Sequence, residues 1–229
     1  STYQNVSVGY IAKTNETGTL DTSFNTTIGT GFDSDILSLK VDSTNKAHFG
    51  GYFSDFNGNV ANGYYVLNSD GTSSTSFMEN VGTGCDGGGY IQSIQEQADG
   101  KILIGGWFSG WNGNTSNNYK FLIRLNTDGT VDTNFQTNLG TGISNEITFI
   151  EIQSDNKILI GGYFTSVNGV TVNRLARLNS DGTPDTSFNT NLGTGLPSGL
   201  DYYEGGIGVQ SDGKIVIAYE GTTFNGNTV

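Results

Sequence analysis

The stretch DNKILIGGYFTSVNGVTVNRLARLNSDGTPDTSF, residues 155–188, decides the fold of this chain. Its apolar residues alternate instead of recurring at helical spacing, and Asp-Asn, Asn-Gly and Asp-Gly pairs interrupt them. This pattern predicts one β-hairpin over residues 147–164 and a second over residues 174–188, which turns at Asp181-Gly182. Because one sheet of four short strands cannot bury both of its faces, the unit needs neighbours that pack against it.

The same unit occurs four times along the chain. Its landmarks are a closing phenylalanine, a lysine that opens the second strand and an Asn-Gly pair, found at Phe24, Phe77, Phe135 and Phe188, at Lys46, Lys101, Lys157 and Lys214, and at Asn57, Asn112, Asn168 and Asn225. Repeats of four short antiparallel strands predict an all-β chain that forms a β-propeller of four four-stranded antiparallel blades.

The two ends of the sequence each match half of a blade. Residues 1–24 correspond to a second hairpin only, and residues 197–229 correspond to a first hairpin only. We therefore expect a single domain over residues 1–229, with three blades formed within continuous sequence and a fourth composite blade. The blades cover approximately residues 33–77, 86–135, 143–188, and 197–229 together with 1–24. The N-terminal strands would complete the last blade and close the ring.

The recurring motif DGK-I-L-x-GG-x-F, then Asn-Gly, then R-L-N-x-DG-x-x-D-x-x-F resembles the delta-sixty repeat β-propeller family of bacterial surface proteins and phage structural proteins. The resemblance implies an extracellular or virion-associated protein without assigned catalysis. It also implies more than four blades in the complete propeller. The alternative to a closed ring is therefore an arc of a larger propeller.

The composition is acidic and sparsely charged. The 229 residues include 10 basic and 22 acidic residues, which gives a net charge of −12. Nucleic acid and anionic membranes are therefore poor partners, and no apolar run approaches the ~18 residues of a membrane-spanning helix. Few lysines with abundant Asn, Ser, Thr, Gly and Tyr are typical of secreted, cell-surface or virion proteins. The single cysteine, Cys85, forms no internal disulfide and lacks metal-ligand spacing, so we expect neither metal nor cofactor.

Aromatic residues gather just before each Asn-Gly pair. Aromatic faces beside amides suit sugar rings, so a ligand surface is expected at Trp107, Trp111, Asn112, Tyr52, Phe56, Tyr163 and Asn168. The competing interpretation is that these rings form the wedge between blades.

Comparison of the repeats also predicts structural ion pairs across the second hairpin. The pairs are Lys13 with Asp21, Arg124 with Asp132, and Arg177 with Asp185. The second copy has Val66 and Ser74 there, as expected if the two charges are lost together. His48, the only histidine, is expected to be a packed or solvent-facing strand residue without a catalytic role.

These features favour a non-enzymatic structural or adhesive module, such as a component of a phage fibre or a bacterial surface adhesin. Its expected partners are other protein subunits or surface glycans, in a homo-oligomer or a larger assembly. One alternative is a lectin that uses the aromatic loop residues. Another is a glycoside hydrolase, which would draw its two carboxylates from Asp33, Asp35, Asp55, Glu151, Asp201 and Glu204.

Overall fold

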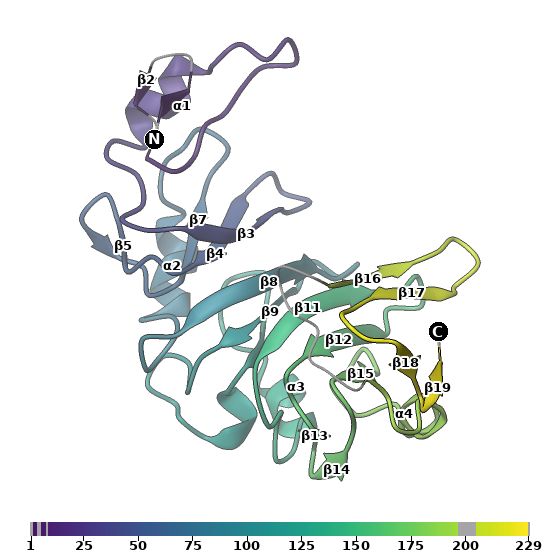
Figure 1. The fold of residues 1–229 in the computed structure, drawn as a ribbon. Helices are drawn as coiled ribbons and strands as arrows, with labels where there is room; N and C mark the ends of the chain where they lie inside the picture. Colours follow the sequence, from purple (N-terminus) through teal and green to yellow (C-terminus); the bar gives the residue numbers. More distant parts are fainter. Residues whose placement is uncertain (1, 4–5, 8, 197–204, 229) are drawn as a thin grey trace.

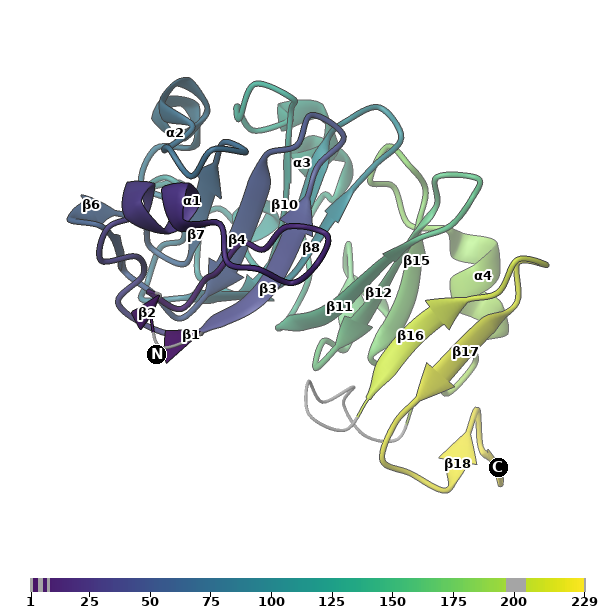
Figure 2. The same ribbon diagram turned by 90° about the horizontal axis from the view of Figure 1, so that it is seen from above.

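The computed structural model, which describes residues 2–3, 6–7, 9–196 and 205–228, forms a crescent of stacked β-sheets (Figures 1 and 2). The chain runs from one tip of the crescent to the other, so the first and last repeats lie at opposite ends (Figure 1). Within this part of the chain, no helix is both long and apolar enough to cross a membrane.

Three repeats each contain a three-stranded antiparallel sheet. Their strands are β3 (Ile36–Val41), β4 (Ala47–Gly51) and β7 (Tyr64–Leu67); β8 (Tyr90–Glu96), β9 (Ile102–Trp107) and β10 (Leu122–Leu125); and β11 (Ile147–Ile152), β12 (Ile158–Gly162) and β15 (Leu175–Leu178). The fourth repeat contributes the hairpin β16 (Gly206–Val209) and β17 (Ile215–Ala218). The structure thus confirms the antiparallel all-β architecture.

Small additional elements decorate these sheets. Two-residue strands form β1 (Thr2–Tyr3) with β2 (Val6–Ser7), β5 (Asp55–Phe56) with β6 (Asn59–Val60), β13 (Ser166–Val167) with β14 (Val170–Thr171), and β18 (Thr223–Phe224) with β19 (Asn227–Thr228). The helices are α1 (Thr22–Thr27), α2 (Thr75–Val81), α3 (Thr133–Asn138) and α4 (Thr186–Asn191), with a 3-10 turn η1 (Asn117–Tyr119).

The predicted fourth strand of each blade is wrong. Where a strand was expected over residues 183–188, Pro184 makes a single bridge to Leu178 and the helix α4 begins at Thr186. The reason is helix capping, because the Asp185 side chain accepts the backbone N–H of Phe188. Asp132 caps α3 in the same way, through the N–H of Phe135. The repeated Asp-x-x-Phe motif is therefore a helix start.

Neighbouring repeats pack through isoleucines set against glycines. A Cβ atom on Gly50 would lie 2.5 Å from Ile91 Cγ2 of the next repeat, and one on Gly105 would lie 2.8 Å from Ile147 Cγ2. Such distances are too short for a real side chain, so Gly50 and Gly105 admit the neighbouring strand. The closing phenylalanine enters the same junctions, since Phe135 is fully buried with Ile147 and Ile150.

The described residues show no closed ring. Strand β17 pairs with β16 alone, and no described strand of residues 2–24 joins that sheet. Residues 197–204 of the expected composite blade lie outside the described residues. The first and last repeats remain apart in both ribbon views (Figures 1 and 2).

Candidate functional site

Each of the three complete repeats presents an aromatic residue to solvent just after its second glycine. Tyr52, Trp107 and Tyr163 are 47%, 46% and 38% exposed, respectively. The residues that come after them, Phe53, Phe108 and Phe164, are at most 1% exposed. This alternation is what a strand imposes, because successive side chains point to opposite sides. The first ring of each pair therefore faces solvent, and the second fills the core.

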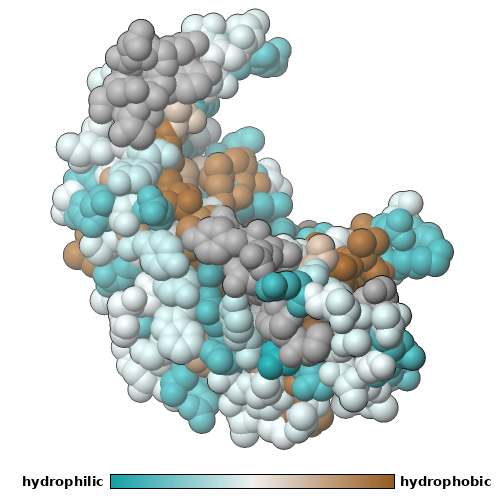
Figure 3. Space-filling model, viewed as in Figure 1, coloured by the Kyte–Doolittle hydropathy of each residue, from teal (hydrophilic) through white to brown (hydrophobic). Residues whose placement is uncertain are grey.

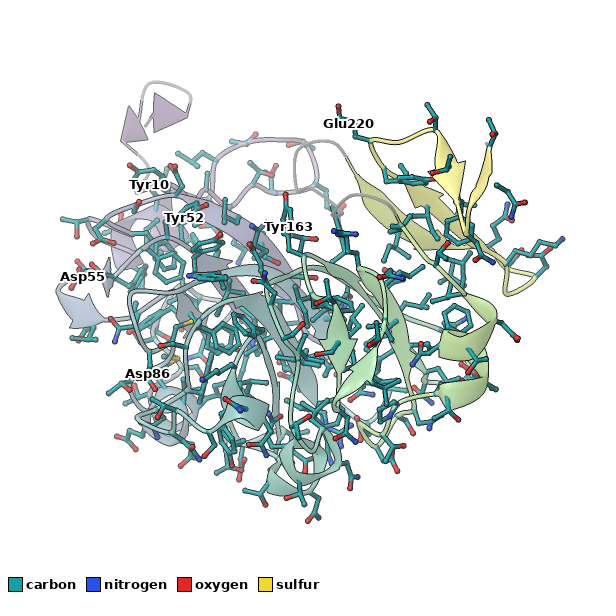
Figure 4. The ribbon with its side chains drawn as sticks, turned by 60° about the horizontal axis from the view of Figure 1, so that its bottom comes forward. Tyr10, Tyr52, Asp55, Asp86, Tyr163 and Glu220 are labelled. Atoms are coloured by element: carbon teal, nitrogen blue, oxygen red, sulfur yellow. The ribbon has the colours of Figure 1, made fainter. Side chains whose placement is uncertain are left out.

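Two of the exposed rings, those of Tyr52 and Trp107, continue into a connected row. Tyr52 lies 4.5 Å from Tyr90 between ring centroids, and Trp107 lies 5.4 Å from Phe121. Tyr90 is the direct cross-strand partner of Trp107, which joins the two ring pairs. We call Tyr52, Tyr90, Trp107, Phe121 and Tyr163 the aromatic row. Figure 4 shows Tyr52 and Tyr163 on the ribbon, with Glu220 at the corresponding position of the fourth repeat.

The buried carboxylate of Glu146, in the third repeat, binds Tyr90 of the aromatic row. Glu146, 9% exposed, accepts hydrogen bonds from the Tyr90 hydroxyl at 3.0 Å and from Gln92 Nε2 at 2.8 Å. Burial, together with the charge of Glu146, raises the pKa of Tyr90, so this phenol stays protonated as a donor. The Glu146 carbonyl also accepts the N–H of Tyr163. The site therefore combines rigid rings with polar groups.

The sequence patterns did not predict Tyr90 and Glu146 as site residues. Neither belongs to the aromatic cluster before an Asn-Gly pair, and their contact joins residues 56 positions apart. The available signal was the cross-strand position of Tyr90 opposite Trp107, which the hairpin register determines.

Four predicted ligand residues have structural positions instead. Trp111 and Phe56 are 1% and 2% exposed and lie in the core rather than on the surface. Asn112 and Asn168 occupy tight turns at φ 49°, and their Oδ1 atoms each accept a backbone N–H, 3.1 Å from Thr83 N and Thr141 N respectively. The Asn-Gly pair thus locks the Gly-Thr-Gly loop that leads into its repeat.

The structural ion pairs lie where the repeat comparison placed them. Lys13 Nζ lies 3.5 Å from Asp21. Arg124 lies 2.9 Å from Asp132, and Arg177 lies 2.9 Å from Asp185. A second basic residue joins each of the last two pairs, because Lys101 Nζ lies 2.7 Å from Asp132 and Lys157 Nζ lies 2.8 Å from Asp185. The geometry differs from a cross-strand pair, since the acidic partner caps a helix.

These contacts shift the acidity of Asp132. Burial acts to raise its pKa, but hydrogen bonds from Lys101, the Phe135 N–H and Arg124 outweigh it and lower the pKa to about 2. The carboxylate is therefore charged throughout the neutral range.

In the first repeat, where Val66 and Ser74 replace the charged residues, a histidine cluster takes the place of the ion pair. His48 is completely buried, with Nε2 3.0 Å from Asp42 Oδ2 and Nδ1 2.6 Å from the Tyr64 hydroxyl. His48 is the cross-strand partner of Val66, as Leu103 is of Arg124. Burial lowers the pKa of His48, although Asp42 acts in the opposite direction. Both ring nitrogens have partners and solvent is excluded, so the cluster is a buried polar network.

Among the acidic residues considered for glycoside hydrolysis, Asp33 and Asp55 are neighbours, because Asp33 Oδ1 accepts the backbone N–H of Asp55 at 3.1 Å. Asp33 is bound to Ser54, whose N–H and hydroxyl lie at 2.9 and 2.7 Å. Burial raises the pKa of Glu151. Asp201 and Glu204 lie outside the described residues. Over residues 9–196 and 205–228, no group of three His, Cys, Asp or Glu side chains is arranged to hold a metal ion.

The sequence matches one family of known proteins. Residues 1–24, 97–135 and 153–188 match the family described as "Domain of unknown function (DUF5122) beta-propeller". No curated protein matches the chain. The matched segments make up less than half of the 229 residues, and they coincide with the helix-capping and Gly-Gly motifs of the repeats. This match, together with the stacked antiparallel sheets, supports placing the chain in a β-propeller family.

Proposed function

We propose that this chain is a non-enzymatic structural and adhesive module, displayed outside the cell or on a virion, that holds its partner through the aromatic row. The observation that carries the proposal is the outward placement of Tyr52, Trp107 and Tyr163 at one position of successive repeats. Monomeric proteins rarely expose contiguous apolar surface without a binding role. A phage fibre and a bacterial surface adhesin are the two settings that fit this proposal.

The fold that we propose for the module is an arc of a β-propeller, the alternative to the closed four-bladed ring. Support comes from the crescent shape and from the open edge of β17. The closed ring requires residues 8–24 to complete the sheet of residues 206–220 within one chain. The two folds therefore differ in the distance between the first and fourth repeats, which can be measured.

Surface glycans are the ligand class that the aromatic row fits best, which makes a lectin the second candidate. Sugar C–H faces stack on Tyr and Trp rings, while hydroxyls pair with neighbouring amide and carboxylate groups. Tyr90, Gln92 and Glu146 hydrogen-bond to one another beside the rings and hold Tyr90 in place. The net charge of −12 favours neutral or basic partners over nucleic acid and anionic membranes.

A glycan array tests this proposal. We expect saturable binding by the wild-type chain and at least a tenfold loss for Trp107→Ala and for Tyr52→Ala. Val170→Ala is the matched control, since Val170 is 54% exposed on a hairpin outside the aromatic row. Glycan binding that survives both substitutions contradicts a role for the aromatic row, and turnover of a bound glycan contradicts a non-enzymatic module.

A further inference from the structure

The loop that enters the second repeat is longer than its counterparts. In the first and third repeats, residues 33–35 and 144–146 separate an isolated β-bridge from the isoleucine that pairs with the Gly-Gly motif. In the second repeat, residues 86–90 fill this interval, which makes five residues against three. The additional residues belong to the run Gly87-Gly88-Gly89. Because the shorter loops join the same elements, the fold itself does not require the insertion.

The inserted glycines present a run of backbone donors. Gly87 and Gly88 have φ 76° and 67°, a left-handed conformation that glycine adopts without steric cost. Among the described residues, no hydrogen bond uses the N–H of Gly87, Gly88 or Gly89. A Cβ atom on Gly88 would meet no other atom within 4 Å, so the loop borders open space. Successive N–H groups in a turn of this kind form a concave site for oxygen acceptors.

The aspartate before the glycines has a different hydrogen-bond partner from its counterparts. Asp33 and Ser144, at the same position of the first and third repeats, each accept the backbone N–H groups of two successive residues. Asp86 instead accepts the N–H of Gly113 through Oδ2, at 2.8 Å. Its Oδ1 accepts no hydrogen bond from the residues that the structure describes. One carboxylate oxygen is therefore available to a ligand.

These groups line a pocket between the first and second repeats. The pocket has a volume of about 260 Å³, and its lining includes Gly87–Gly89, Asp86, Asn62 and Tyr52. Asn62 donates through Nδ2 to the carbonyl of Thr83 at 2.7 Å, which leaves its Oδ1 as a further acceptor. Tyr52 is the first ring of the aromatic row and is 47% exposed. The pocket therefore lies at one end of the aromatic row.

The chemistry of the pocket favours a neutral, hydroxyl-rich ligand. Figure 3 shows hydrophobic side chains mainly in the hollow of the crescent, whereas most of its outer surface on this face is hydrophilic. A hydroxyl both donates and accepts, so it can pair with the glycine N–H groups and with the carboxylate of Asp86. An anionic ligand would be repelled by Asp86 and by the net charge of −12. The volume lies below the ~300–1,000 Å³ of pockets for drug-sized molecules, which limits the occupant to about one sugar ring.

We propose that residues 86–89, together with Tyr52 and Asn62, form a subsite for one neutral hexose unit of a glycan. The sugar ring stacks on Tyr52, and its hydroxyls accept from the glycine N–H groups and donate to Oδ1 of Asp86 and of Asn62. This inference rests on the proposed function and deepens it, because the aromatic row holds the glycan along its length and the subsite selects one unit.

Titration of isotopically labelled protein with free sugars tests the subsite. The probes are glucose, galactose and mannose as neutral hexoses and N-acetylneuraminic acid as an acidic sugar, each followed by amide NMR. We expect at least one neutral hexose to shift the amide resonances of Gly87–Gly89 saturably. The acidic sugar should shift them less at equal concentration.

Two variants alter the subsite in different ways. Deletion of Gly87 and Gly88 gives the loop the length of its counterparts, and Asp86→Ser introduces the residue type that the third repeat has there. Each should weaken hexose binding at least fivefold, and Asp86→Ser carries the test alone if the deletion variant does not fold. Asp155→Ser is the matched control, since it removes the same charge from an exposed turn of the third repeat and should leave hexose binding unchanged.

Trp107→Ala separates the subsite from the aromatic row, because Trp107 does not line the pocket. It should weaken oligosaccharide binding on a glycan array at least tenfold and leave the hexose titration unchanged. Oligosaccharide binding that requires Trp107 but survives both Asp86→Ser and the glycine deletion overturns the subsite and leaves the proposed function standing. The subsite is also overturned if no hexose shifts Gly87–Gly89, or if N-acetylneuraminic acid shifts them more strongly. A wild-type chain that binds no glycan at all overturns both proposals.

Discussion

Arg124 Nη2 lies 2.9 Å from Asp132 Oδ2, and the same aspartate starts the helix α3 by accepting the N–H of Phe135. One carboxylate thus ties the third strand of a repeat to the helix that leads into the next. Both side chains are 7% exposed, so loss of Asp132 leaves the buried charge of Arg124 without this partner, whereas loss of Arg124 leaves Asp132 paired with Lys101.

Asp132→Asn separates the charge of this carboxylate from its capping role, because asparagine is an equally good N-cap. We expect a loss of about 2–4 kcal/mol in the free energy of unfolding at pH 7, from the uncompensated charge of Arg124. Urea denaturation measures this loss. Asp128→Asn is the control, since Asp128 lies in an exposed turn and its carboxylate accepts the N–H and hydroxyl of Thr130. An equal loss in both variants contradicts a special role for the Arg124 pair.

The same carboxylate predicts acid sensitivity. Its pKa of about 2 lies below the unfolded value near 3.8, so its stabilisation is complete above pH ~4 and is lost as pH falls toward 2. The lost stabilisation is about 2 kcal/mol. Urea denaturation between pH 5 and pH 2 should therefore show wild type and Asp132→Asn converging. A constant difference across that range contradicts the lowered pKa.

His48 predicts a separate loss of stability on acidification, which begins at a higher pH than the loss due to Asp132. Since burial lowers its folded pKa, the unfolded chain takes up the proton first, and stability falls as pH drops below about 6.5. His48→Gln keeps hydrogen-bonding capacity without this titration. We expect the melting temperature of the wild type, but not of His48→Gln, to decrease between pH 7 and pH 5. Parallel curves contradict the prediction.

The junction glycines predict that a substitution at this position changes stability more in an interior repeat than in the fourth repeat. Gly105→Ala places a methyl group 2.8 Å from Ile147 Cγ2 and 2.9 Å from Ile150 Cδ1, so we expect a loss of about 1–3 kcal/mol. Ile150→Val, by making room, should partly rescue Gly105→Ala in a double-mutant cycle. Ala218→Gly, at the equivalent exposed position of β17, is the control. In monomeric protein it should change stability by less than about 1 kcal/mol.

Periodicity in the sequence was sufficient to predict the strands and the repeat. Alternating apolar residues predicted the first three strands of each repeat, and the intervals between lysines and Asn-Gly pairs predicted the repeat itself. The helices were missed because a six-residue helix such as α3 has no apolar period, and its only signal is the capping aspartate. Trp111 was expected on the surface, since a single sequence does not tell which ring of an aromatic pair faces inward until the strand register is known.

The ends of the chain show a second limit of sequence reasoning. The match between residues 1–24 and 197–229 predicts which segments complement each other, but it does not specify whether they meet within one chain. That depends on the rotation between successive repeats, which is set by junctions such as Gly50 against Ile91 and not by any motif. The crescent leaves the two halves unpaired.

The distance between the first and fourth repeats tests the open arc most directly. Ser43, Ala98 and Ser211 occupy equivalent exposed positions in the hairpin turns of the first, second and fourth repeats, and the native Cys85 is buried from a spin label. Pulsed dipolar EPR on Ser43→Cys/Ala98→Cys calibrates the distance between adjacent repeats. For Ser43→Cys/Ser211→Cys diluted into excess unlabelled chain, the arc predicts a clearly longer distance than this calibration. A diluted distance equal to that between adjacent repeats would mean a ring closed within one chain, and would contradict the open arc.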